Sequence, residues 1–157
     1  MLTISRADFA DPALAAFLQA HIDDMQPTAP PESQHALEFG ELSQPSVRLW
    51  VAHERGVLVG TAALALLSPG HEELKSMRTD PARRGAGIAS ALLDYLLDDA
   101  RSRNIEQISL ETGSMEFFAS ARRLYAKHGF VECGPFGTYI EDPHSTFMTM
   151  KLTARAR

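Results

Sequence analysis

The sequence predicts an α/β (α+β) fold in which a mixed, mostly antiparallel central sheet is flanked by helices. Two observations predict it. Residues 46–54, 57–68 and 71–79 have strand patterns separated only by short turns, so we expect them to form an antiparallel meander. A helical pattern over residues 88–103 then leads to another strand pattern at residues 106–112, and a helical crossover joins parallel strands.

The elements before the meander are marked by their boundaries. A short strand is predicted at residues 2–5. Asp11 can cap a following helix, and Pro12 suits the first helical position, where its missing N–H is not needed. Prolines in residues 26–33 end that helix, and Ser33 can cap a second short helix after it.

The strands of the meander differ in their patterns. The first alternates, with Val47, Leu49 and Val51 on one side. The second is apolar on both faces, which predicts a central strand. Gly60 within it predicts a bulge or a close approach of another part of the chain.

Two helices and a last strand complete the fold. The helix at residues 88–103 has an apolar side made by Ile88, Ala89, Leu92, Leu93 and Leu96. Another helix is predicted over residues 114–130, ending at Gly129, with Phe130 placed for the hydrophobic contact of a glycine cap. The strand at residues 145–152 has Met148, Met150 and Leu152 on one side.

Composition argues against several classes of protein. The chain has 157 residues, so we expect one domain over residues 1–157. Its formal net charge of −5 argues against a nucleic-acid partner, which usually requires a basic face. No apolar run approaches about 18 residues, and no basic leader precedes one, so neither a membrane span nor a signal peptide is expected. The single Cys133 suits the cytoplasm, and no Cys/His set indicates a metal.

The stretch TDPARRGAGIASALLDYLL, residues 79–97, carries the strongest functional signal. A helix start leaves about four backbone N–H groups unpaired, and preceding glycines let an anion approach them. The stretch lacks the Gly-Lys-Ser/Thr of a P-loop and the third glycine of a dinucleotide fingerprint. It predicts a phosphate cradle; the alternative is a glycine-rich turn with surface arginines. The cradle would be formed by Arg83, Arg84, Gly85, Ala86, Gly87, Ile88, Ala89 and Ser90.

The order of elements and two motifs resemble the GNAT superfamily of acyl-CoA-dependent N-acyltransferases. The family's Gln/Arg-x-x-Gly-x-Gly/Ala motif is matched by Arg84, Gly87 and Ala89. Its Ala-x-x-Leu-Tyr pattern followed by Gly-Phe is matched by Ala121, Leu124, Tyr125, Gly129 and Phe130. The resemblance covers roughly residues 45–152.

This resemblance implies acetyl-CoA as the cosubstrate, with its pyrophosphate in the cradle. In the family, the strand before the cradle bulges and splays from its parallel neighbour, and the pantetheine arm enters the gap. The backbone near Met77 and Thr79 is then expected to contact the arm and the acetyl carbonyl, where an N–H group stabilises negative charge. The chain departs from the family at Phe118, where asparagine is common, and this removes one polar contact to the arm.

Tyr125 matches the family's tyrosine that protonates the leaving thiolate. A phenol with a pKa of about 10 is protonated at neutral pH and can supply that proton. The alternative is a tyrosine that only packs at a helix end.

The general base is expected to be Glu73, because the family sometimes places a glutamate on this strand. By alternation Glu73 shares a face with Lys75 and Met77, and an ion pair with the lysine is the alternative role. Glu111, His35 and a water chain to solvent are the other candidates for the base.

Two segments resemble those of a subgroup of small bacterial GNAT proteins and are expected to wall the acceptor pocket. They are PPESQHALEF, residues 30–39, and GPFGTYIEDPHSTF, residues 134–147. Structural loops are the alternative. The acceptor-binding candidates are Ser33, His35 and Tyr139.

The resemblance therefore predicts an N-acetyltransferase that moves an acetyl group from acetyl-CoA to a primary amine of a small molecule or an amino acid. A protein N-terminus or lysine side chain is the alternative acceptor. A non-catalytic CoA-binding sensor and a nucleic-acid-binding domain are the rival classes; Tyr125 argues against the first and net charge against the second. A homodimer is a further expectation, because GNAT domains often dimerise.

Overall fold

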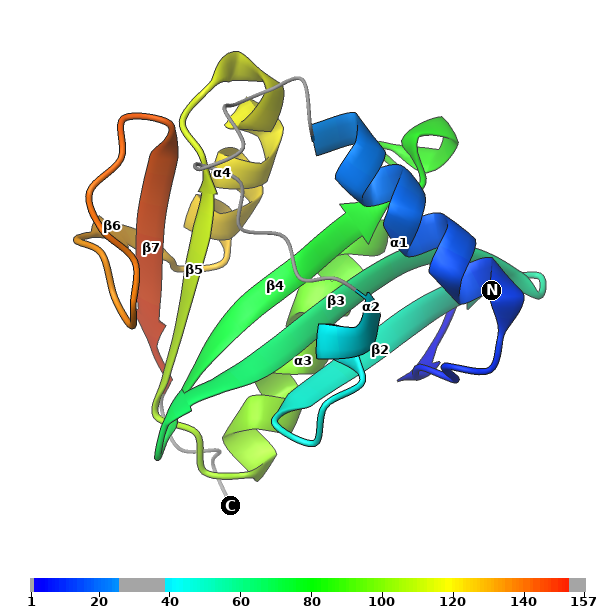
Figure 1. The fold of residues 1–157 in the computed structure, drawn as a ribbon, viewed down its shortest axis with the longest axis horizontal. Coiled ribbons are helices and arrows are strands. Elements are labelled where there is room, and N and C mark those ends of the chain that lie inside the picture. Colours follow the sequence, from blue (N-terminus) through cyan, green and yellow to red (C-terminus); the bar gives the residue numbers. More distant parts are fainter. Residues whose placement is uncertain (1, 26–38, 153–157) are drawn as a thin grey trace.

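The computed structural model describes residues 2–25 and 39–152 of the chain (Figure 1). Its described strands are β1 (Leu2–Arg6), β2 (Val47–Glu54), β3 (Val57–Ser68), β4 (His71–Thr79), β5 (Gln107–Gly113), β6 (Val131–Cys133) and β7 (Ser145–Lys151). The helices are α1 (Pro12–Met25), α2 (Phe39–Leu42), α3 (Ile88–Ser102) and α4 (Ala119–Lys127), with short 3₁₀ helices η3 (Pro81–Arg83) and η4 (Glu116–Phe118).

The strands form one sheet with the order β1-β2-β3-β4-β5-β7-β6. Only β4 and β5 run parallel; the other neighbours in the sheet are antiparallel. The helix between the parallel strands is α3, as the crossover argument requires. The predicted fold class, with its antiparallel meander and its parallel pair, is therefore confirmed.

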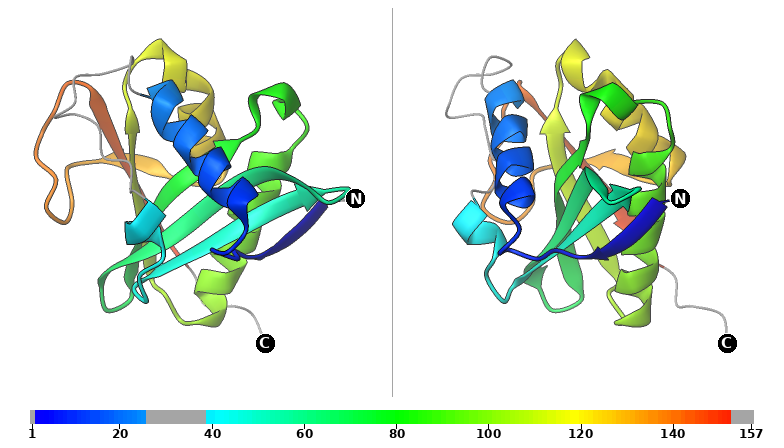
Figure 2. Two further views of the ribbon diagram at one scale, coloured as in Figure 1. Left: turned by 45° about the vertical axis from the view of Figure 1, so that its right-hand side comes forward. Right: turned by 90° about the vertical axis from the view of Figure 1, so that its right-hand side faces the viewer.

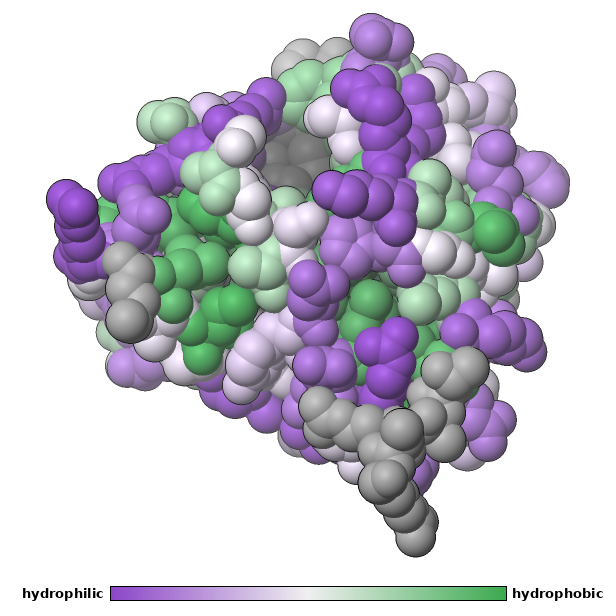
Figure 3. All heavy atoms as spheres, turned by 180° about the vertical axis from the view of Figure 1, so that it is seen from behind, coloured by the Kyte–Doolittle hydropathy of each residue, from purple (hydrophilic) through white to green (hydrophobic). Residues whose placement is uncertain are grey.

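Helices cover both faces of the sheet. The helices α1 and α2 lie on one face, and α3 and α4 lie on the other (Figures 1 and 2). On the α3 side, the buried residues of that helix are Ile88, Leu92, Leu93, Leu96, Leu97 and Ala100. The α1 side has a second core of Leu14, Leu18, Leu42, Val47, Leu49, Val51 and Ala63. Seen from behind, the face that α3 and α4 cover is a mixture in which hydrophilic side chains prevail (Figure 3).

Gly60 lets α3 approach β3 closely, as its position in a central strand predicted. A Cβ atom at this position would lie 2.9 Å from Leu92 Cδ1 and 3.0 Å from Ile88 Cγ2. A Cβ atom at these separations would force the side chains of Leu92 and Ile88 to move. The first turns of α3 are thus fixed against the sheet, and with them the position of the predicted cradle.

A β-bulge interrupts β4 three residues before the strand ends. Ser76 has a φ of 54°, and the pairing with β3 shifts between the pairs Ala63–Lys75 and Thr61–Arg78. The Thr61 hydroxyl donates a 2.8 Å hydrogen bond to the Ser76 carbonyl and so holds the bulge. Because a bulge adds one residue, the side chains after it change faces.

This bulge corrects one expectation. Alternation predicted that Glu73, Lys75 and Met77 share a face, but Met77 packs against the core on the α3 side. Arg78 instead reaches α1, where its guanidinium lies 5.6 Å from the centre of the Phe17 ring.

The strands β4 and β5 separate after the Leu74–Leu110 pair. Their parallel pairing runs from His71–Gln107 to Leu74–Leu110 and stops there, although β4 continues to Thr79 and β5 to Gly113. The two facing edges past Leu74 and Leu110 are therefore not paired with each other, and Figure 1 shows the strands diverging there.

Two elements differ from the sequence predictions. The strand β6 was not predicted, because three residues, two of them exposed, carry no readable periodicity. The helix predicted from residue 114 begins at Ala119, after η4. Arg122 Nη1 donates to the carbonyls of Gly113 and Met115 at 2.6 and 2.9 Å, and this bonding holds the preceding residues in a turn.

Candidate active site

The predicted phosphate cradle is a short loop between β4 and α3. Asp80 starts it: its carboxylate accepts a 3.0 Å hydrogen bond from Ala82 N–H and caps η3. Gly85 and Gly87 follow with φ angles of 84° and 81°, a conformation that favours glycine. The first bond of α3 runs from Ala91 N–H to the Gly87 carbonyl, so the N–H groups of the preceding turn have no helical acceptor.

The space in front of this loop is open. A Cβ atom added to Gly85 or Gly87 would meet no other heavy atom within 4 Å. N–H groups at a helix start that face open space bind anions well, because the helix dipole adds a partial positive charge. The residues present therefore fit a bound pyrophosphate.

The two arginines of the cradle differ in their surroundings. Arg83 Nη1 forms an ion pair with Glu54 Oε1 at the end of β2. Arg84, which follows η3, is exposed. Arg84 is therefore the stronger candidate for a charged contact with phosphate oxygens.

Tyr125 belongs to the core on the α3 side of the sheet. It is buried on α4, at 6% exposure, and its ring packs edge-on against Phe130 with 5.9 Å between centroids. Burial, and to a lesser extent the negative charge of Glu111, raise the pKa of Tyr125 above its ordinary value of 10.0. A phenol in this environment keeps its proton, as a proton donor must.

Glu73, Lys75 and Tyr139 form a cluster on the opposite face of the sheet from α3. Tyr139 Oη donates a 2.5 Å hydrogen bond to Glu73 Oε2. Lys75 Nζ lies 3.2 Å from the same carboxylate oxygen and 2.9 Å from the phenol oxygen. The structure thus brings together one base candidate and one acceptor candidate, and it also forms the ion pair that was the alternative for Glu73.

Tyr139 lies in the connection between β6 and β7, next to two aromatic rings. The rings of Phe136 and Phe147 lie 5.1 and 5.5 Å from the Tyr139 ring. Burial raises the pKa of Tyr139, and the charge and the hydrogen bond of Glu73 raise it further. Tyr139 therefore keeps its proton and donates it in the hydrogen bond to Glu73.

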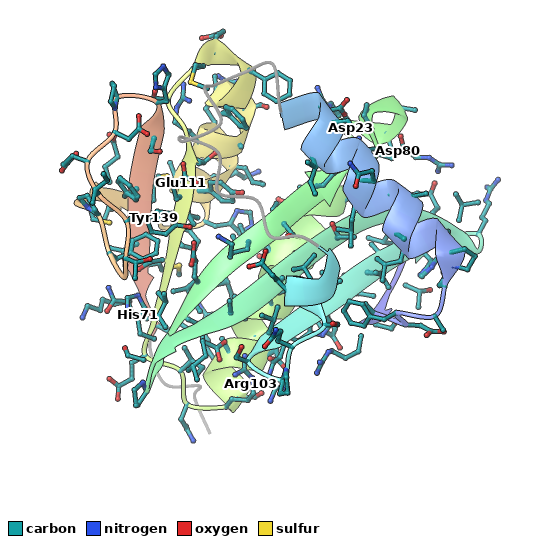
Figure 4. The ribbon with its side chains drawn as sticks, in the orientation of Figure 1. Asp23, His71, Asp80, Arg103, Glu111 and Tyr139 are labelled. Carbon is teal, nitrogen blue, oxygen red and sulfur yellow. The ribbon has the colours of Figure 1, made fainter. Side chains whose placement is uncertain are left out.

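The negative charge of Glu111 acts on both Tyr125 and Tyr139. Glu111 is the first residue of β5 after the last parallel pair, and it pairs with Phe147 of β7. Its charge contributes to the raised pKa of both Tyr125 and Tyr139. In Figure 4 the labelled side chains of Glu111 and Tyr139 lie on the β5 side of the opening, and Asp80 marks the far end of β4.

Other predicted site residues are placed by these elements or fall outside them. Met77 lies in the bulge region, and Thr79 pairs with Gly60 at the end of β4, so both are next to the diverging edge. Ser33 and His35 lie outside the described residues.

Sequence reasoning missed Arg78. Its side chain is only 9% exposed, and Nη1 forms a 2.8 Å ion pair with Asp24 Oδ2 of α1. The positive φ of Ser76, which turns Arg78 toward α1, is not visible in the sequence.

Comparison with known proteins decides the family. The Acetyltransferase (GNAT) family matches residues 14–130 of this chain. The chain belongs to the GNAT acetyltransferase family. N-acetyltransferase YedL of Escherichia coli strain K12 is 43% identical over 152 residues, which are 97% of this chain and 96% of YedL. N-acetyltransferase YsnE of Bacillus subtilis strain 168 is 41% identical over 92% of this chain and 96% of its own.

A solved structure agrees with these sequence relatives. A Klebsiella pneumoniae protein described as an acyl-CoA N-acyltransferase superposes with a TM-score of 0.79 and 30% identity, covering 98% of this chain and 99% of that one. This GNAT chain is therefore an N-acetyltransferase that takes its acyl group from a CoA-linked donor. Within the described ranges, no helix has the length and apolar character needed to cross a membrane.

Proposed function

We propose that this GNAT enzyme transfers the acetyl group of acetyl-CoA to the primary amine of a small molecule or an amino acid, with residues 1–157 acting as one catalytic domain. The observation that carries the proposal is the opening between β4 and β5. The opening starts after the Leu74–Leu110 pair and extends toward the end of β4, which leads into the glycine loop before α3. Glu73 lies one residue before that last pair, and Tyr125 belongs to the core on the α3 side of the sheet.

The donor would be held by the chain's backbone. The N–H groups of Gly85 and of Gly87 to Ser90, with Arg84, would bind the pyrophosphate, because they combine the helix dipole with a full charge. Ala86, whose N–H donates to the Arg83 carbonyl, would line the cradle. The edge of β4 near Met77 and Thr79, which is not paired with β5, would present backbone groups to the pantetheine arm. When bound, acetyl-CoA supplies an activated acetyl thioester.

The two proton transfers of the reaction would take place on opposite faces of the sheet. Tyr125 would give its proton to the leaving thiolate, a role that its match to the family's tyrosine supports; because its pKa is raised, the phenol is protonated at neutral pH. On the other face, the amine proton would pass to Tyr139 Oη as Tyr139 gives its own proton to Glu73 Oε2. The 2.5 Å bond between these two oxygens supports this transfer.

The acceptor is expected on the Glu73 side of the sheet. Tyr139 is only half-buried whereas Glu73 is buried, so the tyrosine is the member of the pair that a small molecule can contact. Ser33 and His35 complete the proposed acceptor side from sequence reasoning alone. The single thiol of Cys133 suits the cytoplasm as the compartment, and a homodimer is part of the proposal.

A panel of amines tests the proposal. Small primary amines, amino acids, a peptide with a free N-terminus and a peptide with a lysine would each be incubated with acetyl-CoA, and free thiol would be measured. We expect acetylation of small amines or amino acids. Acetylation of the peptides alone would favour a protein acceptor, and CoA binding without any acetyl transfer would favour a sensor.

A further inference from the structure

Arg78 is placed beside the reaction centre by the bulge in β4. It follows Met77 directly, and consecutive Cα atoms are about 3.8 Å apart. Its side chain points to the α1 side of the sheet, the side that also carries Glu73, Lys75 and Tyr139. A guanidinium there can contact a molecule whose amine is at the diverging strands.

The guanidinium of Arg78 is buried but incompletely bonded. The side chain is 9% exposed, and among the described residues its ion-pair partner is Asp24, whose Oδ2 contacts Nη1 and whose side chain is 48% exposed. Nε of Arg78 is buried and has no hydrogen-bond partner among the residues that the structure describes. A buried N–H without an acceptor costs free energy, so its presence requires an explanation.

Arg103 shows how this chain satisfies a purely structural guanidinium. Its Nε donates to Asp99 at 2.7 Å, and both Nη atoms donate to Glu72 at 2.9 Å. All three nitrogens are bonded, and they tie α3 to β4. Arg78 has the burial of a structural arginine without the bonding, which is the state expected of a residue that binds a ligand.

The chemistry of the site favours a carboxylate. The planar fork of a guanidinium matches the two oxygens of a carboxylate, and Nε is one arm of that fork. The Phe17 ring covers the guanidinium at 5.6 Å and limits the access of water. Asp24 already places one negative charge at Nη1, so a singly charged carboxylate is tolerated better than a doubly charged phosphate.

We infer that Arg78 binds a carboxylate of the acceptor, and that the acceptors of this enzyme are amines that carry a carboxylate, with amino acids as the simplest class. The inference rests on the proposed function, because it assigns a chemical group to the proposed acceptor. It excludes the amine of a long peptide, whose neighbouring carboxyl is an amide.

Matched pairs of acceptors test the inference. Each amino acid is compared with its own primary amide, which keeps the amine and loses the carboxylate. We expect wild-type kcat/KM to be about 10- to 100-fold higher for the acid than for the amide, the loss that follows from one charged hydrogen-bonded contact. Arg78→Gln should remove this preference by lowering kcat/KM for the acid alone, and Arg78→Lys should keep part of it.

Binding provides the second readout. Titration calorimetry of the best amino acid into CoA-loaded protein should show weaker binding for Arg78→Gln and the wild-type CoA affinity. Asp24→Asn is the matched control, because it breaks the ion pair and leaves Nε in place; it should keep the preference for acids.

The outcomes separate the two ideas. Equal use of acids and amides by the wild type, or an equal loss on both in Arg78→Gln, would overturn the inference and leave the acetyltransferase intact. Transfer to no amine of any kind would refute the proposed function, and the inference would fall with it.

Discussion

Tyr139 Oη donates a 2.5 Å hydrogen bond to Oε2 of Glu73, a residue 66 positions earlier in the chain. The bond joins the connection between β6 and β7 to β4, the strand that forms one edge of the opening. Both groups belong to a buried or half-buried cluster with Lys75, so neither exchanges its partner freely with water. Tyr139 and Glu73 are therefore held together as one hydrogen-bonded unit.

The first prediction is that Glu73 and Tyr139 act together. Glu73→Gln should lower kcat by about 10²–10⁴, the usual share of a general base, and Tyr139→Phe should lower it by at least about 10. Because the two act in sequence, the double variant should be no slower than Glu73→Gln alone. Steady-state rates with saturating acetyl-CoA measure this, and multiplied losses would contradict the coupling.

Glu72→Gln is the control for this pair. Glu72 is as buried as Glu73, but it lies on the other face and binds Arg103. Its substitution should lower the melting temperature while leaving the rate per folded molecule near the wild-type value.

The second prediction concerns the cradle. Gly87→Ala adds a methyl group in the space proposed for the pyrophosphate, where no protein atom lies within 4 Å. CoA affinity measured by calorimetry should fall, and Arg84→Ala should weaken it by about 1.5–3 kcal/mol through a lost charged contact. Gly87 has a φ of 81°, so alanine also adds backbone strain of roughly 1–2 kcal/mol.

Gly70→Ala separates strain from ligand contact. Gly70 has a φ of 79° but lies in the turn between β3 and β4, at the opposite end of β4 from the cradle. The Gly70→Ala variant should lose about as much unfolding free energy as Gly87→Ala and keep the wild-type CoA affinity. Equal CoA affinity in both glycine variants would refute the cradle.

The third prediction is a pH dependence of stability from His71. Its Nε2 lies 2.7 Å from Ser109 Oγ, and burial, with a smaller effect of Lys151, lowers the pKa of His71 below its ordinary value of 6.5. The folded state therefore favours neutral His71, while the unfolded state takes up a proton near pH 6.5. This contribution to stability is present above about pH 6.5 and is lost as the pH falls below it.

The comparison that isolates His71 is urea unfolding of wild type and His71→Gln between pH 5 and 8. The difference in unfolding free energy between the two proteins should shrink toward pH 5. A difference that grows as the pH falls would show that His71 is stabilised in its charged form instead.

Local sequence patterns predicted much of the fold, because helix amphipathicity and turn conformation are set by residues close together in the chain. The helical spacing of Leu92, Leu93 and Leu96 predicted the buried side of α3, and all three are buried. The glycines before the helix predicted an anion site, which stays a prediction; Gly85 and Gly87 have the positive φ angles that favour glycine. Such features depend on residues within a few positions of one another, which a sequence displays directly.

Features that depend on distant segments were not readable. Strand alternation failed at Met77 because Ser76 adds one residue to β4, and what fixes that bulge is a bond from Thr61 of a different strand. The ion pair of Arg83 with Glu54 and the bond of Tyr139 to Glu73 likewise join segments that only the folded sheet brings together. The candidate residues could therefore be proposed from the sequence, and so could the ion pair of Glu73 with Lys75 two residues away, but the partners on distant segments could not.

The fourth prediction concerns the proton donor. Tyr125→Phe keeps the ring that packs against Phe130 and removes only the hydroxyl. CoA affinity and thermal stability should stay near the wild-type values. In the wild type, the pKa of Tyr125 is raised above 10, so kcat should show no loss from this group as the pH rises to about 10.

The most direct test of the central claim is the single-turnover rate of acetyl transfer from acetyl-CoA to the best amine of the panel, measured for wild type and Tyr125→Phe at equal occupancy by acetyl-CoA. We predict transfer by the wild type and a rate about 10²–10⁴ lower in the variant. A variant that transfers acetyl at the wild-type rate, or a wild type that binds acetyl-CoA and transfers nothing, would contradict the account.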